Sequence, residues 1–226
     1  LFRAYLDRAM VKMAFENPET LTSLGFLESI GIKGHNAHLD DVDPANDKAL
    51  FAELTTFRQG LMQYQDADLD ENQQLSKDIA IYLLDMLDEF EKYQYHNYPA
   101  NQMFGIQSAF PSFMESSHQV NTLEDANNYL SRLGEVKRKY TQHLIGLEKR
   151  ESLGIIPPRF VIDRVLDEMR SFVATPSTEN ILYTSLQSKL DKADSFSAED
   201  KQTILAKTDI AIRESVYPAY GLFIDY

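Results

Sequence analysis

The sequence predicts an all-α protein, and three observations support this. Apolar side chains recur every three or four residues through most of the 226-residue chain. Residues typical of helix starts precede these segments, and no stretch shows the alternation that predicts a β-strand. We therefore expect a multi-helix bundle or array of seven to eight helices.

The first part of the chain predicts two helices and a loop. One apolar face begins at Phe2, and this helix should end at Asn17 because a residue that precedes proline, here Pro18, disfavours the α region. A short helix over 18–24 follows. Residues 25–43 are rich in Gly, Asn, His and Asp without a period, so they predict a surface loop.

The next two helices have clear start signals. Asp43 and Pro44 can open a helix that reaches about residue 64. Asp70 opens another, which has the apolar pattern of an amphipathic helix. Its recurring apolar side chains are Leu75, Ile79, Tyr82, Leu83, Met86, Leu87 and Phe90. Residues 95–112, with two prolines and a glycine, then interrupt the helical pattern.

Two further helices are predicted in the middle of the chain. Thr122 can cap the amide of Asp125, and the apolar stripe that follows continues towards Leu147. Pro157 and Pro158 open the next helix, since a missing amide is harmless in a first turn. This helix should end before residue 175, where Thr-Pro follows.

The last part of the chain predicts one shorter and one long helix. Residues 181–190 support the shorter one, and Ser197 caps the longer one. Pro218 lies inside the pattern of the long helix and should kink it. The missing backbone bond costs about 3 kcal/mol unless tertiary contacts compensate.

Composition and charge exclude several classes of protein. The chain carries 35 acidic and 22 basic side chains, for a net charge of −13, and contains no Cys. Nucleic-acid binding depends on clustered Lys and Arg, whereas the densest cluster here spans only residues 137–139. We therefore expect no nucleic-acid partner. No apolar run approaches the roughly 20 residues that a membrane helix needs.

Two histidines in the predicted loop are the first candidates for a metal site. His35 and His38 are three residues apart, and three aspartates follow by residue 43. Without Cys, a metal would depend on such His and Asp side chains. A loop without a framework to fix the imidazoles favours solvated side chains instead, so we predict no metal site here. No His is followed by Glu, so the zinc peptidase helix motif is absent.

Two segments outside the regular helices carry the strongest functional signal. The first places Asn101, Gln102 and Gln107 in the break between two long helices, where loops on a rigid scaffold tend to carry function. Their amides could line a substrate cleft or could satisfy loop backbone groups, and the sequence favours neither alternative.

The second segment fixes the position of an arginine. Arg159 follows the double proline in the first turn of its helix, and a rigid guanidinium can form a bidentate pair with a carboxylate. An internal Asp or Glu is the simpler partner, and the end of a peptide substrate is the alternative. Asn101, Gln102, Gln107 and Arg159 are thus the substrate-cleft candidates, and no residue is assigned as catalytic.

These segments resemble a known family. The matching motifs are Tyr98-Pro-x-Asn-Gln-x-x-Gly-x-Gln107 with Pro111-Ser-Phe113, Ile156-Pro-Pro-Arg-Phe-Val-Ile-Asp163 and Ser215-Val-x-Pro-Ala-Tyr220. Over essentially its whole length the chain resembles the N-terminal half of bacterial proteins with the domain of unknown function 885. The resemblance implies a largely helical protein of the cell envelope or periplasm and a metal-dependent peptidase similar to zincin carboxypeptidases. The family's His-Glu-x-x-Pro-Gly-His stretch has no counterpart here, so its catalytic residues cannot be placed on this chain.

The resemblance gives the expected function. Residues 1–226 would be a single helical region of a larger protein, lacking the metal-binding half and not catalytically competent alone. The region would form the substrate cleft of an envelope-associated metal-dependent peptidase. The alternative is a non-enzymatic helical binding or scaffold module of the cell envelope.

The same resemblance gives the expected partners. The full-length protein would use zinc and a peptide substrate, whereas this part would hold no cofactor. Its partners would be its own C-terminal half and, because the last helix is apolar, a second copy in a homo-oligomer. A lipid anchor outside the chain would be its link to the membrane.

Overall fold

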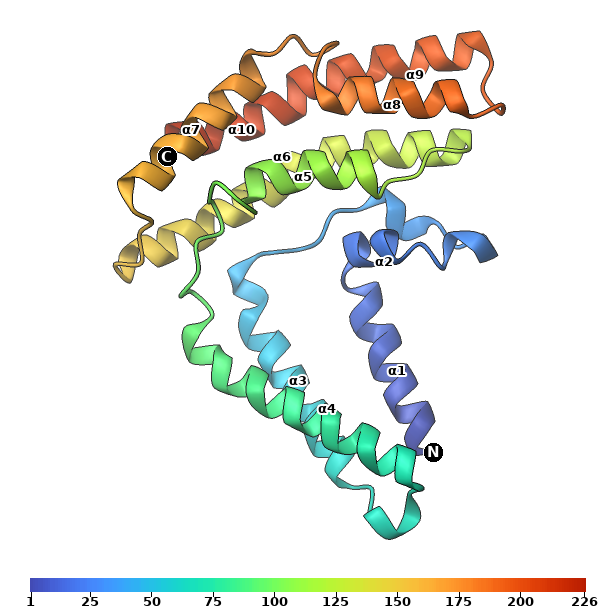
Figure 1. The fold of residues 1–226 in the computed structure, drawn as a ribbon, viewed down its shortest axis with the longest axis vertical. Coiled ribbons are helices and arrows are strands. Elements are labelled where there is room, and N and C mark those ends of the chain that lie inside the picture. Colours follow the sequence, from blue (N-terminus) through green and yellow to red (C-terminus); the bar gives the residue numbers. More distant parts are fainter.

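The computed structural model describes all 226 residues, and its regular elements are all helical (Figure 1). The all-α prediction is confirmed. The α-helices are α1 (Phe2–Phe15), α2 (Pro18–Leu24), α3 (Asp47–Met62), α4 (Glu71–Phe90), α5 (Ile106–Ser116), α6 (Leu123–Ser152), α7 (Arg159–Ala174), α8 (Ile181–Lys192), α9 (Ala198–Ala211) and α10 (Tyr217–Asp225). A π-helical turn joins α9 and α10 into one continuous helix. No helix has both the length and the apolar content needed to cross a membrane.

Side-chain caps begin three of the helices at the positions that the sequence indicates. Asp70, Thr122 and Ser197 each accept a hydrogen bond from the backbone amide three residues later. In each case the side chain at that third position bonds back to the amide of the cap, which completes a capping box. Two orphan amides are thereby satisfied at each helix start.

The body of the protein is built around α6, a helix of 30 residues. Its buried face carries Tyr129, Leu133, Val136 and Tyr140, which belong to a core of 22 buried residues. Helices α5, α7, α8, α9 and α10 contribute most of the other side chains of this core. Burying one side chain of the size of Leu stabilises the fold by about 1.5–3 kcal/mol, so this core accounts for most of the apolar stabilisation.

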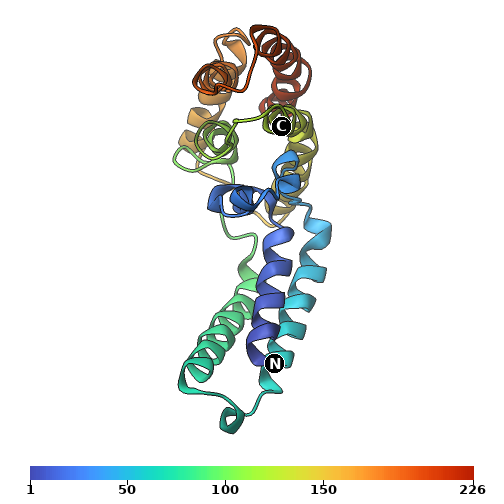
Figure 2. The same ribbon diagram turned by 90° about the vertical axis from the view of Figure 1, so that its right-hand side faces the viewer.

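Helices α1, α3 and α4 form an arm that extends away from this body (Figures 1 and 2). The arm has a separate small core of Phe2, Leu61, Leu69 and Leu84. The N-terminus lies at the far end of the arm and the C-terminus lies in the body. The arm therefore depends on far fewer buried side chains than the body does.

The apolar face predicted for the helix after Asp70 is largely exposed in α4. Its seven side chains, from Leu75 to Phe90, keep between 38% and 69% of their surface accessible to solvent. The opposite face of α4, with Leu84, packs against the arm core instead. The periodicity thus identifies the helix correctly, but its apolar face has no partner in this chain.

Helix α5 was not expected, because Pro99, Gly105 and Pro111 interrupt the apolar pattern. The helix begins at Ile106, directly after Gly105, and continues through Pro111. Proline cannot donate the backbone bond to the carbonyl four residues earlier. That carbonyl, on Gln107, accepts a hydrogen bond from the Tyr220 hydroxyl at 2.5 Å. A contact from α10 therefore compensates for the proline, and sequence periodicity cannot reveal it.

The disturbance expected near Pro218 takes the form of a π-helical turn. Residues Ile212–Val216 adopt π geometry, and Pro218 follows this turn as the second residue of α10. Ile212 and Val216 are fully buried in this turn. The turn therefore belongs to the core of the body.

Candidate functional site

Two segments far apart in the sequence meet beside the end of α10. Tyr98–Ala100 precede α5, and Ile155–Pro157 connect α6 to α7. With side chains of α7 and with Phe223–Tyr226 they line a mostly apolar hollow of about 330 Å³. The α7 side chains are Ile162, Val165, Leu166 and Met169. Both segments that the sequence singles out thus contribute to one surface hollow.

The end of α6 directs the second segment into the hollow. Gly154 has a φ of +73°, which favours glycine, and its amide donates to Glu151 O at 2.8 Å. The Ile155 amide donates to Arg150 O at 2.9 Å, which completes a Schellman motif. The two prolines that follow fix the direction of the chain into α7.

One arginine of α6 lines the hollow without an anionic partner. Arg150 donates from Nε and Nη2 to Asn97 Oδ1 at 3.0 and 2.6 Å, and from Nη1 to Gly146 O at 2.8 Å. Its guanidinium also lies 5.2 Å from the centre of the Tyr95 ring. No carboxylate lies within 4 Å of it, and burial lowers the pKa of Arg150. This cation is therefore positioned by neutral groups.

Two acidic residues border the same hollow. Glu151 accepts a hydrogen bond from the Tyr226 hydroxyl at 2.9 Å, and Asp225 lies on the adjoining turn of α10. Burial and the nearby Glu151 raise the pKa of Tyr226 to about 12. The hollow therefore combines apolar walls with one cation and two carboxylates at its edge.

Asn101 and Gln107 lie together around the close approach at Gly105. Asn101 donates to Tyr98 O and accepts from the amides of Met103 and Phe104, each at 2.9 Å. Gln107 is 2% exposed and donates to Asn101 O at 2.7 Å and to Glu168 Oε2 at 2.9 Å. Their amides are thus engaged in holding the loop that leads into α5.

The other two candidates of the sequence lie at the surface. Gln102 is exposed on the same loop as Asn101. Arg159 is 94% exposed, and its Nε lies 3.7 Å from Asp163 Oδ2, one turn along α7. Neither residue lines the hollow, and the nearest carboxylate to Arg159 is that of Asp163 on its own helix.

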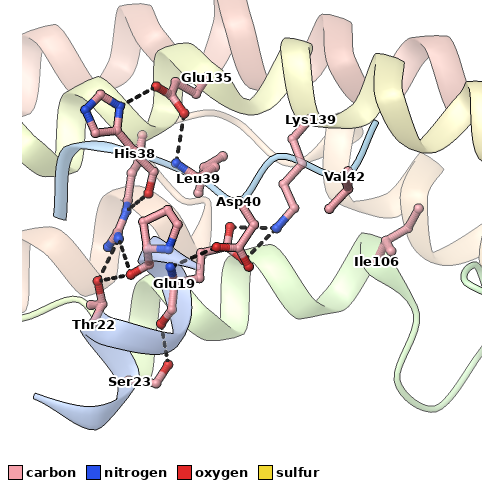
Figure 3. A network of polar contacts seen from close by, with 12 residues as sticks. Glu19, Thr22, Ser23, His38, Leu39, Asp40, Val42, Ile106, Glu135 and Lys139 are labelled. Carbon is pink, nitrogen blue, oxygen red and sulfur yellow. Dashed lines mark hydrogen bonds and ion pairs between the residues drawn. The ribbon is translucent and has the colours of Figure 1, made fainter. Parts of the chain in front are cut away.

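A second hollow, of about 370 Å³, lies between α2, α5 and α6. Figure 3 shows the polar contacts of Glu19, Asp40 and Lys139, which line it. Lys139 Nζ contacts both carboxylate oxygens of Glu19 at 2.6 Å, and the Glu19 amide donates to Asp40 Oδ1 at 3.0 Å. Burial raises the pKa of Asp40, and the Glu19 carboxylate adds to this shift. On the same wall, burial lowers the pKa of His143 to about 4, so this imidazole is neutral at pH 7. The charges of this hollow are paired with one another.

The loop that contains the two candidate metal-binding histidines is anchored to α6. His35 Nε2 lies 2.8 Å from Glu28 Oε1, whereas His38 Nδ1 lies 2.9 Å from Glu135 Oε1. The two imidazoles therefore face different carboxylates and do not converge. His35 and Asn36 are buried, so the prediction of solvated side chains is wrong for these two residues. No group of three His, Asp or Glu side chains in the chain is placed to hold a metal ion.

A buried arginine supplies the framework that this loop was expected to lack. Arg132 is fully buried and donates to the carbonyls of His38 and His35 at 2.8 and 3.1 Å. It also donates to Thr22 Oγ1 at 2.6 Å and to His118 Nδ1 at 2.8 Å. Burial lowers the pKa of Arg132 to about 10, so the guanidinium stays charged at pH 7.

His118 completes this network in its neutral form. Its Nε2 lies 3.2 Å from Asp125 O, and its Nδ1 accepts from Arg132. Burial, with the charge of Arg132, lowers the pKa of His118 to about 3. Residues 25–43 and the start of α6 are thereby held together by side chains that cannot face water.

Sequence reasoning missed the polar side of α6. Arg132, Glu135, Lys139 and His143 follow one another at intervals of three or four residues, next to the apolar stripe. That spacing places them along one helix face, and it could have indicated a second contact surface. It could not have shown that the loop 25–43 occupies this surface.

Comparisons with known proteins agree with the fold and with the sequence motifs. Residues 18–226 match a family described as "Bacterial protein of unknown function (DUF885)". The fold is similar to the crystal structure of the putative lipoprotein from Colwellia psychrerythraea, with a TM-score of 0.76 and 16% identity. The similarity covers 93% of this chain but 38% of that chain, so this chain spans less than half of its structural relative. No curated protein matches the chain.

Proposed function

Because the chain belongs to the DUF885 family of bacterial proteins, we propose that it is the N-terminal helical region of an envelope-associated metal-dependent peptidase. In this proposal the region supplies a wall of the substrate cleft and is not catalytically competent alone. The lipoprotein description of the Colwellia relative supports the envelope location. The observation that carries the proposal is the hollow where Tyr98–Ala100 and Ile155–Pro157 meet the end of α10.

The chemistry of this hollow suits a peptide. Its volume of about 330 Å³ and its apolar walls can take an apolar side chain. Arg150 lies at its edge with no carboxylate partner, so its charge is available to a peptide carboxylate or carbonyl group. Arg150 thus takes the role for which the sequence suggested Arg159.

The residues of this chain do not fit a catalytic zinc. His35 and His38 are each paired with a carboxylate, and no three His, Asp or Glu side chains surround a common point. We assign the metal ligands and the general base to the remainder of a longer protein, in keeping with the 38% coverage of the structural relative. The contribution of this region is then limited to binding and orienting the substrate.

The test uses the full-length protein and a matched pair of arginines. Replacing Arg150 by Gln should lower kcat/KM for peptides about tenfold or more, because a charge-assisted contact contributes about 1.5–3 kcal/mol. Arg150→Lys should recover part of this loss. Arg159→Gln, at an exposed arginine outside the hollow, should leave kcat/KM within about twofold.

Metal content and melting temperature decide how the result is interpreted. Hydrolysis that follows bound zinc, with an unchanged Tm for Arg150→Gln, supports the proposal. A zinc-free full-length protein that hydrolyses no peptide would contradict it and would favour a non-enzymatic binding module. The exposed apolar face of α4 is the observation that favours this second function.

A further inference from the structure

The exposed face of α4 is an organised apolar surface outside the body core. It consists of Leu75, Ile79, Tyr82, Leu83, Met86, Leu87 and Phe90. The spacing of these residues places them along one side of a 20-residue helix. We refer to them as the α4 apolar face. Helix α4 packs mainly on α3 through its other side, and the arm extends away from the body (Figures 1 and 2).

One border of the α4 apolar face is acidic. Glu71, Asp78, Asp85 and Glu89 are exposed and follow at intervals of seven, seven and four residues, which places them along one edge of the helix. Only Asp85 forms an ion pair, with Arg58 of α3. The carboxylates of this border are therefore largely free to meet a cationic partner.

The single basic residue of α4 does not neutralise this border. Lys77 contacts Asp66 Oδ1 at 2.6 Å and Tyr64 O at 2.7 Å, on the side that faces the arm. The helix as a whole carries five acidic side chains and one Lys. The α4 apolar face is thus flanked by uncompensated negative charge.

We propose that the α4 apolar face is a docking site for an amphipathic helix whose own apolar stripe is bordered by Lys or Arg. Helices bind to such surfaces through side chains at positions i, i+3, i+4 and i+7, which is the spacing of this face. The acidic border selects the charge of the partner, because opposite charges at the edge of a helix pair set partner choice. This surface is separate from the hollow at α10 and does not depend on the function proposed for it.

The same charges argue against two other occupants. A second copy would bring an equally acidic helix against α4, and like charges at an interface are destabilising. An anionic lipid surface would meet the same repulsion, since membrane-surface helices are usually rich in Lys and Arg on their polar side. A basic helix satisfies both the apolar and the charged parts of the surface.

The experiment measures binding of two synthetic helical peptides to the full chain. One contains only Leu and Lys in an amphipathic pattern, and the other has Glu at every Lys position. Fluorescence anisotropy should give at least tenfold tighter binding for the Leu/Lys peptide, and this preference should decrease with added salt.

Variants locate the binding site on α4. Leu83→Ser with Met86→Ser leaves the net charge unchanged and should weaken binding of the Leu/Lys peptide at least tenfold. Asp78→Asn with Glu89→Gln should weaken it about threefold to tenfold. Phe160→Ser, which removes an exposed aromatic side chain from α7, should change it less than twofold. All of these side chains are exposed, so circular dichroism should show an intact fold.

Three results would overturn the proposal. Equal affinity for both peptides would show that charge does not select the partner. Unchanged binding by the Leu83/Met86 variant would place the peptide elsewhere on this acidic protein. A wild-type dimer in sedimentation, converted to a monomer by the same variant, would identify a second copy as the occupant.

Discussion

The buried Arg132 should be the most sensitive single position in the body of the protein. Replacement by Met retains a long side chain but removes the charge and all hydrogen-bond donors of the guanidinium. The carbonyl of His38 would then lose the Arg132 donor, and the carbonyl of His35 would keep only the amide of His38. Leaving a buried polar group unsatisfied costs about 1–3 kcal/mol, and the bonds to Thr22 and His118 are lost as well.

These contributions predict a loss of about 3–5 kcal/mol of unfolding free energy for Arg132→Met, which is the range for disrupting a buried charged network. Arg138→Met is the matched control. Arg138 lies on the same helix and donates to Leu39 O of the same loop at 2.9 Å, but its side chain is half-exposed. Its replacement should cost less than about 1 kcal/mol.

Urea unfolding followed by circular dichroism measures both free energies. Hydrogen exchange should also show that Arg132→Met exposes the amides of residues 18–40 before the rest of the body. A loss below about 1 kcal/mol, or one no larger than that of Arg138→Met, would refute the idea that Arg132 holds the loop in place.

The remaining predictions concern acid stability, the arm and a close backbone approach. Because folding lowers the pKa of His118 to about 3, stability should be complete above pH 6.5 and fall between pH 6.5 and 3, by up to about 1.4 kcal/mol per pH unit. Urea titrations at several pH values should show a smaller slope for His118→Gln. Leu61→Ala should cost about 2–5 kcal/mol and increase hydrogen exchange mainly in α1, α3 and α4. Gly105→Ala should lower Tm, because its Cβ would lie 2.1 Å from Gln107 Oε1. Gly134→Ala, in open space on α6, should raise Tm instead.

Local chemistry explains why most of the fold could be predicted from sequence. The helix starts at Asp70, Thr122 and Ser197 each depend on a capping side chain and a partner three residues later. A few consecutive residues of the sequence are therefore enough to predict each start. The same holds for the proline-directed start of α7. The family motifs also indicated which segments of the chain were candidates for a functional site.

The features that sequence did not reveal depend on contacts between distant segments. Helix α5 tolerates Pro111 because Tyr220 supplies the missing donor from more than a hundred residues away. Arg132 lies on a helix whose periodicity indicates two faces, but its burial requires the loop 25–43 to cover it. The amphipathic pattern of α4 is real, yet whether an apolar face is covered depends on what packs against it.

The candidate site, like the fold, could be predicted from sequence only in part. The two segments that carry the motifs meet at one hollow, but none of the four candidate side chains Asn101, Gln102, Gln107 and Arg159 lines it. The arginine that reaches the hollow is Arg150 and not Arg159, because Gly154 reverses the chain between them. Only the three-dimensional course of that turn distinguishes a residue that faces the hollow from one that faces solvent.

The π-helical turn between α9 and α10 also fixes how many residues this helix must contain. Ile204, Thr208, Ile212, Val216 and Tyr220 are all buried and are spaced by four residues. In a regular α-helix each such step advances about 40° beyond a full turn, so the fifth side chain would lie on nearly the opposite side. The wider π turn sets this rotation back and keeps Tyr220 directed at Gln107. Deleting one residue there would rotate α10 by about 100°, so the length of this segment is constrained as strictly as its composition.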